Sequence, residues 1–198
     1  ADGISNSNRP EKASKLAMQL LSKMESLSRQ TIYDLQSCLS AELAEDYFGS
    51  ATTFVAAEID QTDHKAKILS VGDSRAYLID AQGKWQQITQ DHSILSELLA
   101  DFPDEKEEDF ATIYGGVSSC LVADYSEFQD KIFYQEIEIQ QGESLLLCSD
   151  GLTDGLSAEV REKIWKQYDN DKSRLTVYRK LIEKQRFYDD LSVIICVF

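Results

Sequence analysis

The chain has 198 residues, enough for one domain with a substantial core, and its 35 acidic and 20 basic side chains give a formal net charge of −15. Such an acidic chain lacks the basic face that a nucleic-acid-binding protein presents, so we exclude nucleic acid as a partner. The hydrophobic fraction of 42% is typical of a soluble globular protein, and no apolar run approaches the roughly 20 residues of a membrane-spanning helix.

The first half of the chain predicts two helices and then a run of strands. Apolar residues recur at helical spacing over residues 11–26 and 30–48, on one face of each segment. From residue 51 onward, β-branched and aromatic residues predict short strands. These strands are expected over 52–59, 66–71, 75–79 and 85–88. Gly72-Asp73-Ser74 predicts a tight reversal, so the strands are interpreted as an antiparallel meander.

The second half predicts further helices and strands around one acidic segment. A short helix is expected from Ser93 through Leu99, and the acidic residues 101–110, with Pro103, predict a surface loop. The remaining elements are expected as strands over 131–139 and 144–148, helices over 157–168 and 173–186, and an apolar strand over 191–198 buried on both faces. This order predicts an α+β domain with antiparallel sheets covered by helices.

Three aspartates occupy unusual places, and two of them, Asp150 and Asp189, lie where a carboxylate is both held and accessible. Asp2 precedes Gly3 in an irregular stretch, Asp150 follows an apolar strand, and Asp189 precedes another. A strand end fixes a side chain, while the adjoining loop leaves it open to solvent. Carboxylate and carbonyl oxygens are the ligands that Mg²⁺ and Mn²⁺ prefer. Each aspartate taken alone is explained better by a turn or a cap, so the metal hypothesis depends on their combination.

Longer strings resemble consecutive signatures of the type-2C, metal-dependent serine/threonine protein phosphatases. In chain order these strings are Ala1–Gly3, Ala51–Ala57, Val71–Leu78, Ile88–Ser93, Leu146–Asp154 and Asp189–Ile194. Six strings in the order of the family, spread over nearly the whole chain, identify it as similar to a short bacterial-type member.

The resemblance implies a sandwich of two antiparallel sheets flanked by helices, as one domain over residues 1–198. A variable flap would occupy about residues 101–119, beside the cleft. The implied reaction is hydrolysis of phosphoserine and phosphothreonine in proteins by direct attack of activated water. The implied substrates are phosphorylated proteins, including those of a cognate serine/threonine kinase.

The resemblance also implies a ligand set for two ions, Mg²⁺ or Mn²⁺, and for a third at a weaker site. Asp2 would bridge the two ions, and the carbonyl of Gly3 would bind one of them. Asp150 and Asp189 would complete the ligands that the protein supplies. Asp91, together with Asp150, would match the third site.

Two departures from the family pattern leave a second hypothesis open. Family members carry one or two strands ahead of the Asp-Gly motif, with an acidic and a basic residue, and we expect these strands to be missing here. Residues 5–7 replace the glycines and histidine that usually follow the motif. The alternative is therefore a catalytically inactive phosphatase-like module that binds a partner. An open sheet edge would also allow self-association.

Other polar residues are interpreted as structural. Asp73 is expected to fix its turn, Arg75 to pair locally, and His92 to donate or accept a structural hydrogen bond. Asp154 fits a helix start as well as a water-mediated metal contact. The absence of a C-x-x-C pair argues against a zinc cluster. Cys148 is expected to be an inert thiol, and the places of Cys148 and Cys196 in apolar strand-like runs favour a reducing, cytoplasmic setting.

Overall fold

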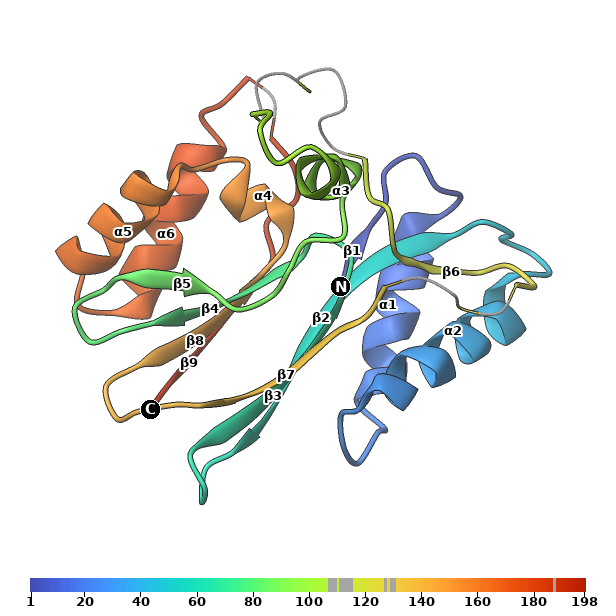
Figure 1. Ribbon diagram of the computed structural model, residues 1–198, viewed down its shortest axis with the longest axis horizontal. Helices are drawn as coiled ribbons and strands as arrows, with labels where there is room; N and C mark the ends of the chain where they lie inside the picture. Colours follow the sequence, from blue (N-terminus) through green and yellow to red (C-terminus); the bar gives the residue numbers. More distant parts are fainter. Residues whose placement is uncertain (107–109, 111–115, 127, 129–130, 187) are drawn as a thin grey trace.

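The structure, a computed structural model, describes residues 1–106, 110, 116–126, 128, 131–186 and 188–198. Two antiparallel sheets lie face to face, and helices cover the outer face of each (Figure 1). This layered arrangement confirms the α+β sandwich expected from the sequence. Among the described residues, no helix is both long enough and apolar enough to cross a bilayer.

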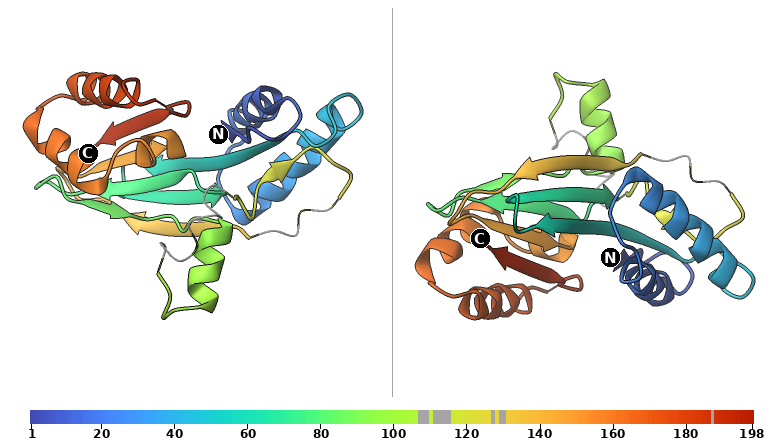
Figure 2. Two further views of the ribbon diagram at one scale, coloured as in Figure 1. Left: turned by 90° about the horizontal axis from the view of Figure 1, so that it is seen from above. Right: turned by 90° about the horizontal axis from the view of Figure 1, so that it is seen from below.

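The elements follow the expected order. The chain begins with β1 (Asp2–Gly3), α1 (Pro10–Leu21), α2 (Arg29–Leu43), β2 (Ala51–Asp60), β3 (Lys65–Val71), β4 (Arg75–Ile79) and β5 (Trp85–Gln87). It continues with α3 (Ile94–Asp101), β6 (Leu121–Val122), β7 (Phe133–Glu138) and β8 (Ser144–Cys148). It closes with α4 (Asp150–Thr153), α5 (Ala158–Gln167), α6 (Asp171–Ile182) and β9 (Val193–Val197). Figure 2 shows α3 projecting from the sandwich.

The strands are divided between the sheets in a way that corrects the expected meander. One sheet has the order β1-β2-β3-β7, with β6 also paired to β2, and the other has the order β5-β4-β8-β9. Strands β3 and β4 are therefore not a hairpin. Residues 72–74 carry the chain from one sheet to the other, and Gly72 adopts a φ of 101° that favours glycine. This crossover lies at the end of the sandwich that holds the candidate site.

Alternating side chains fill separate core layers. In β2, Phe54 and Ala56 pack under α1 and α2, whereas Val55 and Ala57 face the layer between the sheets. A third layer lies under α5 and α6 and contains Leu146 of β8. The period of two follows from the strand pleat, which points successive side chains to opposite faces. Each sheet is consequently covered on both faces.

The first two helices end about five residues earlier than predicted. Helix α1 ends at Leu21 because the sheet holds the segment that follows it. The Glu58 carboxylate accepts hydrogen bonds from the Leu27 backbone N–H, the Ser26 hydroxyl at 2.8 Å and the Lys67 ammonium at 2.9 Å. These contacts fix residues 26–27 as a loop on β2 and β3, so an apolar pattern that would continue the helix is overridden.

The sequence predicted that the last strand would be buried on both faces, and this prediction is wrong. Strand β9 lies at the edge of its sheet, next to β8. Ile194 is 55% exposed and Val197 is 64% exposed. An apolar run identifies a strand but does not say whether that strand is central or at an edge.

The predicted flap is described in part. Residues 107–109 and 111–115 lie outside the described residues, so the flap over 101–119 stays a prediction. At its base, Ser93 and Val117 form an antiparallel bridge. This bridge places Val117 beside the candidate site.

Candidate active site

A cavity of about 250 Å³ opens at the crossover end of the sandwich. Asp2, Asp150 and Asp189, which were predicted from the sequence, all line it. Asp73, Asp154, Gly3, Thr53, Val117 and residues 4–6 complete the described lining. None of the described lining residues is basic, so carboxylates dominate the electrostatics of this carboxylate pocket.

Asp2 is positioned by the short ladder between β1 and β2. Asp2 pairs with Thr53 in register, and the Thr52 hydroxyl donates a 2.7 Å hydrogen bond to the Asp2 carbonyl. Gly3 packs closely against α1, because a Cβ at this position would lie 2.7 Å from the Cβ of Pro10. The ladder on one side and the helix on the other hold the Asp-Gly pair in place.

Asp150 and Asp189 are brought together because β8 and β9 are neighbours. The Ser149 hydroxyl donates to the Asp190 carbonyl at 3.0 Å and accepts from the Ser192 N–H at 3.1 Å. A Cβ on Gly151 would collide with the Asp190 carbonyl, so this position requires glycine. The two loops therefore pack backbone to backbone, with their aspartates on the same cavity.

The carboxylates of the pocket repel one another. Burial, hydrogen bonding with Asp150 and the negative charges of Asp150 and Asp189 raise the pKa of Asp2 to about 7. Burial and the charge of Asp150 raise the pKa of Asp73 to about 6, and burial raises the pKa of Asp154. The buried Oδ1 of Asp150 has no hydrogen-bond partner among the described residues. These carboxylates have no basic neighbour among the described lining residues to balance their charge, as expected of a cation site.

Carboxylates alone do not form a closed cage. In the part of the chain that the structure describes, no three Asp, Glu, His or Cys side chains converge closely enough to enclose an ion. Mg²⁺ is usually held by one or two carboxylates and several waters, so an open pocket with a nearby backbone carbonyl suits it. The residues present therefore fit a hydrated divalent ion better than a dehydrated one.

Asp73 is the aspartate that sequence reasoning misplaced. It was interpreted as fixing a hairpin turn, but it lies on the crossover between the sheets and lines the pocket. The Gly-Asp-Ser-Arg string was visible in the sequence and belongs to the family resemblance. The pairing of β3 and β4 with other strands, which decides where this side chain points, was not visible.

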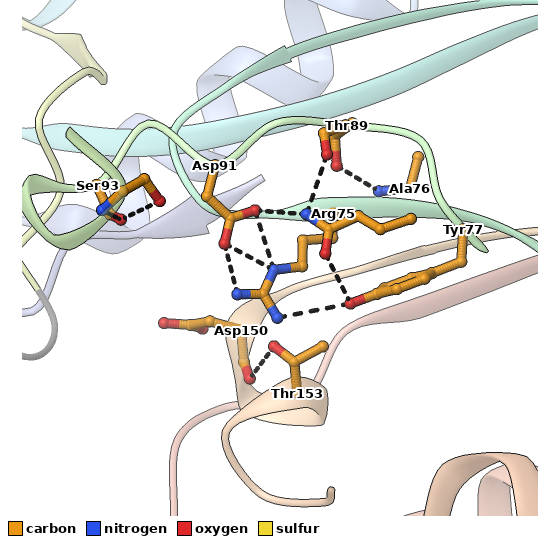
Figure 3. Close-up of polar contacts among 10 residues, drawn as sticks. Arg75, Ala76, Tyr77, Thr89, Asp91, Ser93, Asp150 and Thr153 are labelled. Atoms are coloured by element: carbon orange, nitrogen blue, oxygen red, sulfur yellow. Dashed lines mark hydrogen bonds and ion pairs between the residues drawn. The ribbon is translucent and has the colours of Figure 1, made fainter. Parts of the chain in front are cut away.

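Asp91, which the resemblance implies at a third ion site with Asp150, is not among the described residues that line the carboxylate pocket. Its carboxylate accepts hydrogen bonds from the Arg75 guanidinium, whose Nε lies 2.8 Å from Oδ2, and from Gln87 at 2.8 Å. Arg75 also donates to the Tyr77 hydroxyl (Figure 3). Asp91 is thus held by protein donors in this structure, and its role as a ligand of a third ion stays a prediction.

Two other structural expectations are confirmed. His92 is buried, and its Nδ1 accepts a 3.2 Å hydrogen bond from the Gly72 N–H. Burial raises the pKa of Cys148 to about 12, which makes its thiol unreactive at neutral pH. Asp154 lines the pocket, whereas Ser157 caps the next helix by accepting from the Val160 N–H.

A larger cavity of about 720 Å³ lies at the far end of β2, between the β2–β3 turn and the end of β9. His64, Asp63 and Glu138 are among its lining residues, but its other side chains are amides and apolar groups. It gathers no set of carboxylates comparable to that around Asp150. Size alone therefore does not identify the site.

Comparisons with known proteins identify the family of the chain. The sequence family described as protein phosphatase 2C matches residues 1–175. The serine/threonine phosphatase stp of Listeria monocytogenes is 33% identical over 181 residues, which cover 84% of this chain and 70% of that protein. The protein phosphatase PhpP of Streptococcus pneumoniae is 33% identical over 119 residues, which cover 60% of this chain and 46% of that protein.

Solved structures share the fold. The serine/threonine phosphatase Stp1 of Staphylococcus aureus has a TM-score of 0.82 and 24% identity, covering all (100%) of this chain and 81% of that one. The catalytic domain of the phosphatase PstP, solved in complex with 2 manganese ions, has a TM-score of 0.74 and 23% identity, covering 94% of this chain and 80% of that one. The chain belongs to the protein phosphatase 2C family.

Proposed function

We propose that the carboxylate pocket is the active site for metal-dependent hydrolysis of phosphoserine and phosphothreonine in proteins. Membership of the protein phosphatase 2C family makes the chain a protein phosphatase. The observation that supports this location is the convergence of Asp2, Asp150 and Asp189, from both sheets, on one pocket without a basic lining residue among those described. Divalent ions, when bound there, supply an activated water and stabilise the charge of the phosphoryl group.

Each carboxylate has a proposed role that follows from its placement. Asp2, whose side chain has both Asp150 and Asp189 as charged neighbours, would hold two ions of Mg²⁺ or Mn²⁺ together with the Gly3 carbonyl. Asp150 would contribute the Oδ1 that lacks a partner among the described residues, and the exposed Asp189 would face the mouth of the pocket. The number of ions follows PstP, which was solved with 2 manganese ions.

Asp73 is our candidate for a further ligand, beside the third-site role that the family resemblance implies for Asp91. It lines the same cavity as Asp150 and Asp154, and Asp150 contributes to the rise in its pKa. Ser5, Asn6 and Thr53, with neutral polar side chains, also line the cavity and would donate hydrogen bonds to the oxygens of a phosphate. The pocket would thus combine anionic ligands for cations with neutral donors for substrate.

The wider setting is proposed on chemical grounds. The substrates are phosphoproteins, so a protein serine/threonine kinase must place the phosphate that this chain removes. A reducing, cytoplasmic location is supported by the buried thiol of Cys148 in an apolar layer. Self-association through the sheet edge that missing leading strands would leave open stays a prediction, and β1 lies at the edge of its sheet.

The activity is tested with a phosphothreonine peptide in the presence of Mn²⁺. We expect phosphate release that stops on chelation and is abolished in Asp150→Asn. Asp171→Asn is the matched control, because Asp171 pairs with Arg174 on α6 at 2.7 Å and does not line the pocket. Phosphate release by Asp150→Asn at the wild-type rate would refute the proposal. Mn²⁺ binding without release would instead favour the inactive module.

A further inference from the structure

A further cavity, of about 440 Å³, lies between α2 and the segment that follows β6. Tyr33 of α2, and Tyr125 and Phe128 of that segment, are among the residues that line this aromatic pocket. The Tyr33 and Phe128 rings meet edge to face, with their centroids 5.8 Å apart. Phe48 extends the aromatic surface, because its ring centroid lies 5.9 Å from that of Tyr125. Figure 1 shows α2 and β6 on the side of the molecule opposite α5 and α6.

The two walls of the aromatic pocket are joined by a buried glutamine. The side-chain NH₂ of Gln36 donates to the Val122 carbonyl at 2.6 Å, and its side-chain oxygen accepts from the Val122 N–H at 3.0 Å. Gln36 is 3% exposed and lines the pocket. This two-point contact holds β6 on α2, so the pocket is formed before a ligand binds. A preformed surface loses less conformational freedom on binding than a flexible one.

The aromatic side chains around this pocket are open to solvent. Tyr33 is 45% exposed, Phe48 is 58% exposed and Tyr125 is 77% exposed. Single exposed apolar residues are common on protein surfaces, but a group of neighbouring exposed aromatic rings is typical of a contact surface. The Ser40 hydroxyl oxygen, in the lining of the same pocket, is buried without a hydrogen-bond partner among the described residues. A polar group of a ligand that reached it would satisfy this hydroxyl.

The charge of the pocket has one sign. Its lining residues lie within residues 30–63 and 107–130, two stretches of the sequence without lysine or arginine. Among the described residues that line the pocket, Asp124 is charged and none is basic. The Asp124 Oδ1 accepts hydrogen bonds from the Ser126 N–H at 2.9 Å and from the Ser126 hydroxyl at 2.7 Å. These bonds hold the carboxylate in place beside the rings.

Basic residues close to the pocket in the sequence are bound elsewhere. Arg29, at the start of α2, donates to the Ile132 carbonyl at 2.9 Å. Lys12 of α1 lies over the ring of Tyr47, with its ammonium nitrogen 4.3 Å from the centroid. Neither cation is among the residues that line the aromatic pocket, so the pocket is left both aromatic and acidic.

We propose that the aromatic pocket is a docking surface for a basic segment of a partner protein, which places an arginine or lysine side chain over the rings and against Asp124. Aromatic faces attract cations, and the planar guanidinium of arginine stacks on a ring while it pairs with a carboxylate. The net charge of −15 repels a second copy of the chain, nucleic acid and anionic lipid. A basic protein segment is therefore the occupant that the charges favour. The inference does not depend on the proposed function of the carboxylate pocket.

The test is fluorescence anisotropy at low ionic strength with a labelled peptide of alternating arginine and serine. A second peptide carries citrulline, which has the shape of arginine without its charge, at each arginine. The variants are Tyr125→Ser, Asp124→Asn, which keeps an oxygen for the contacts with Ser126, and the two combined. Asp150→Asn is the matched control, because it removes one charge from the carboxylate pocket instead. Thermal unfolding checks the fold, and Phe48→Ser replaces Tyr125→Ser if that variant does not fold.

We expect the wild type to bind the arginine peptide more tightly than the citrulline peptide. Each single variant should bind the arginine peptide about two- to fivefold more weakly and the double variant about tenfold, whereas Asp150→Asn should bind it as the wild type does. A wild type that binds neither peptide, or both equally, would overturn the inference. Wild-type affinity in the double variant would place the peptide elsewhere and also overturn it. Sedimentation that shows a dimer, dissociated by Tyr125→Ser, would identify a second copy as the occupant and contradict the proposal.

Discussion

Replacing Asp150, a proposed metal ligand, should stabilise this protein when no metal is bound. In the metal-free pocket, Asp2 lies beside Asp150 and Asp189, and their charges help to raise its pKa from 3.8 to about 7. A raised carboxylate pKa means that the folded state disfavours the ionised form. The free energy of unfolding is therefore highest while Asp2 is protonated. It falls as the pH rises from 3.8, the ordinary pKa of the group, toward about 7. Asp150→Asn removes one of the repelling charges.

The size of the effect follows from the same pKa. A rise from 3.8 to about 7 corresponds to at most roughly 4 kcal/mol. Burial, the largest cause, remains in the variant, and the open pocket is screened by water, so we expect Asp150→Asn to recover about 1 kcal/mol. For a chain of this length, that corresponds to a rise of about 2–4 °C in the Tm of the metal-free protein.

The assay is thermal unfolding of chelator-treated protein, with and without added Mn²⁺. The gain in Tm of Asp150→Asn over the wild type should be larger at about pH 8 than at about pH 5, because Asp2 ionises between them. Mn²⁺ at about one hundred times its Kd should stabilise the wild type by about 2.7 kcal/mol and the variant far less. A metal-free variant that melts below the wild type at both pH values would refute the reasoning.

Three other substitutions test the fold around the site. Gly151→Ala would place a methyl group against the Asp190 carbonyl, and we expect a loss of about 1–3 kcal/mol in urea unfolding together with weaker Mn²⁺ binding; intact metal affinity would argue against the loop contact. Hydrogen bonds from the Leu27 N–H and from Lys67 lower the pKa of Glu58 from 4.5 to about 2. The contribution of ionised Glu58 to the stability of the fold is therefore present above pH 4.5 and is lost as the pH falls toward about 2. Glu58→Gln should cost about 1 kcal/mol at neutral pH, allowing for solvent screening, and flatten the acid part of the stability curve. Phe54→Ala, at a fully buried position, should cost about 3–5 kcal/mol, and a loss below about 1 kcal/mol would contradict the packing of β2.

The strands could be predicted because β-branched and aromatic residues gather in short runs between turn residues. The alternation of Phe54 and Val55 between two core layers is the pattern expected of a strand covered on both sides. Asp2, Asp150 and Asp189 could be proposed from their places beside strands and from the family resemblance. Their convergence could not be derived from spacing, because it depends on which strands become neighbours.

The predictions that were wrong share one cause. The pairing of strands depends on residues far apart in the sequence, so a local pattern does not show it. Asp73 looks like a turn residue until β3 and β4 are known to lie in different sheets. The exposure of Ile194 follows from the edge position of β9, which an apolar sequence cannot show.

The exchange of chain between the sheets at residues 72–74 has a mechanical consequence. Asp2 is carried by one sheet, Asp150 by the other, and Asp73 by the link between them. Sliding of one sheet over the other would pull these oxygens apart. Cations bound among them would therefore oppose relative movement of the two sheets. The arrangement of carboxylates that would bind the cations would thus also hold the two sheets together at this end of the molecule.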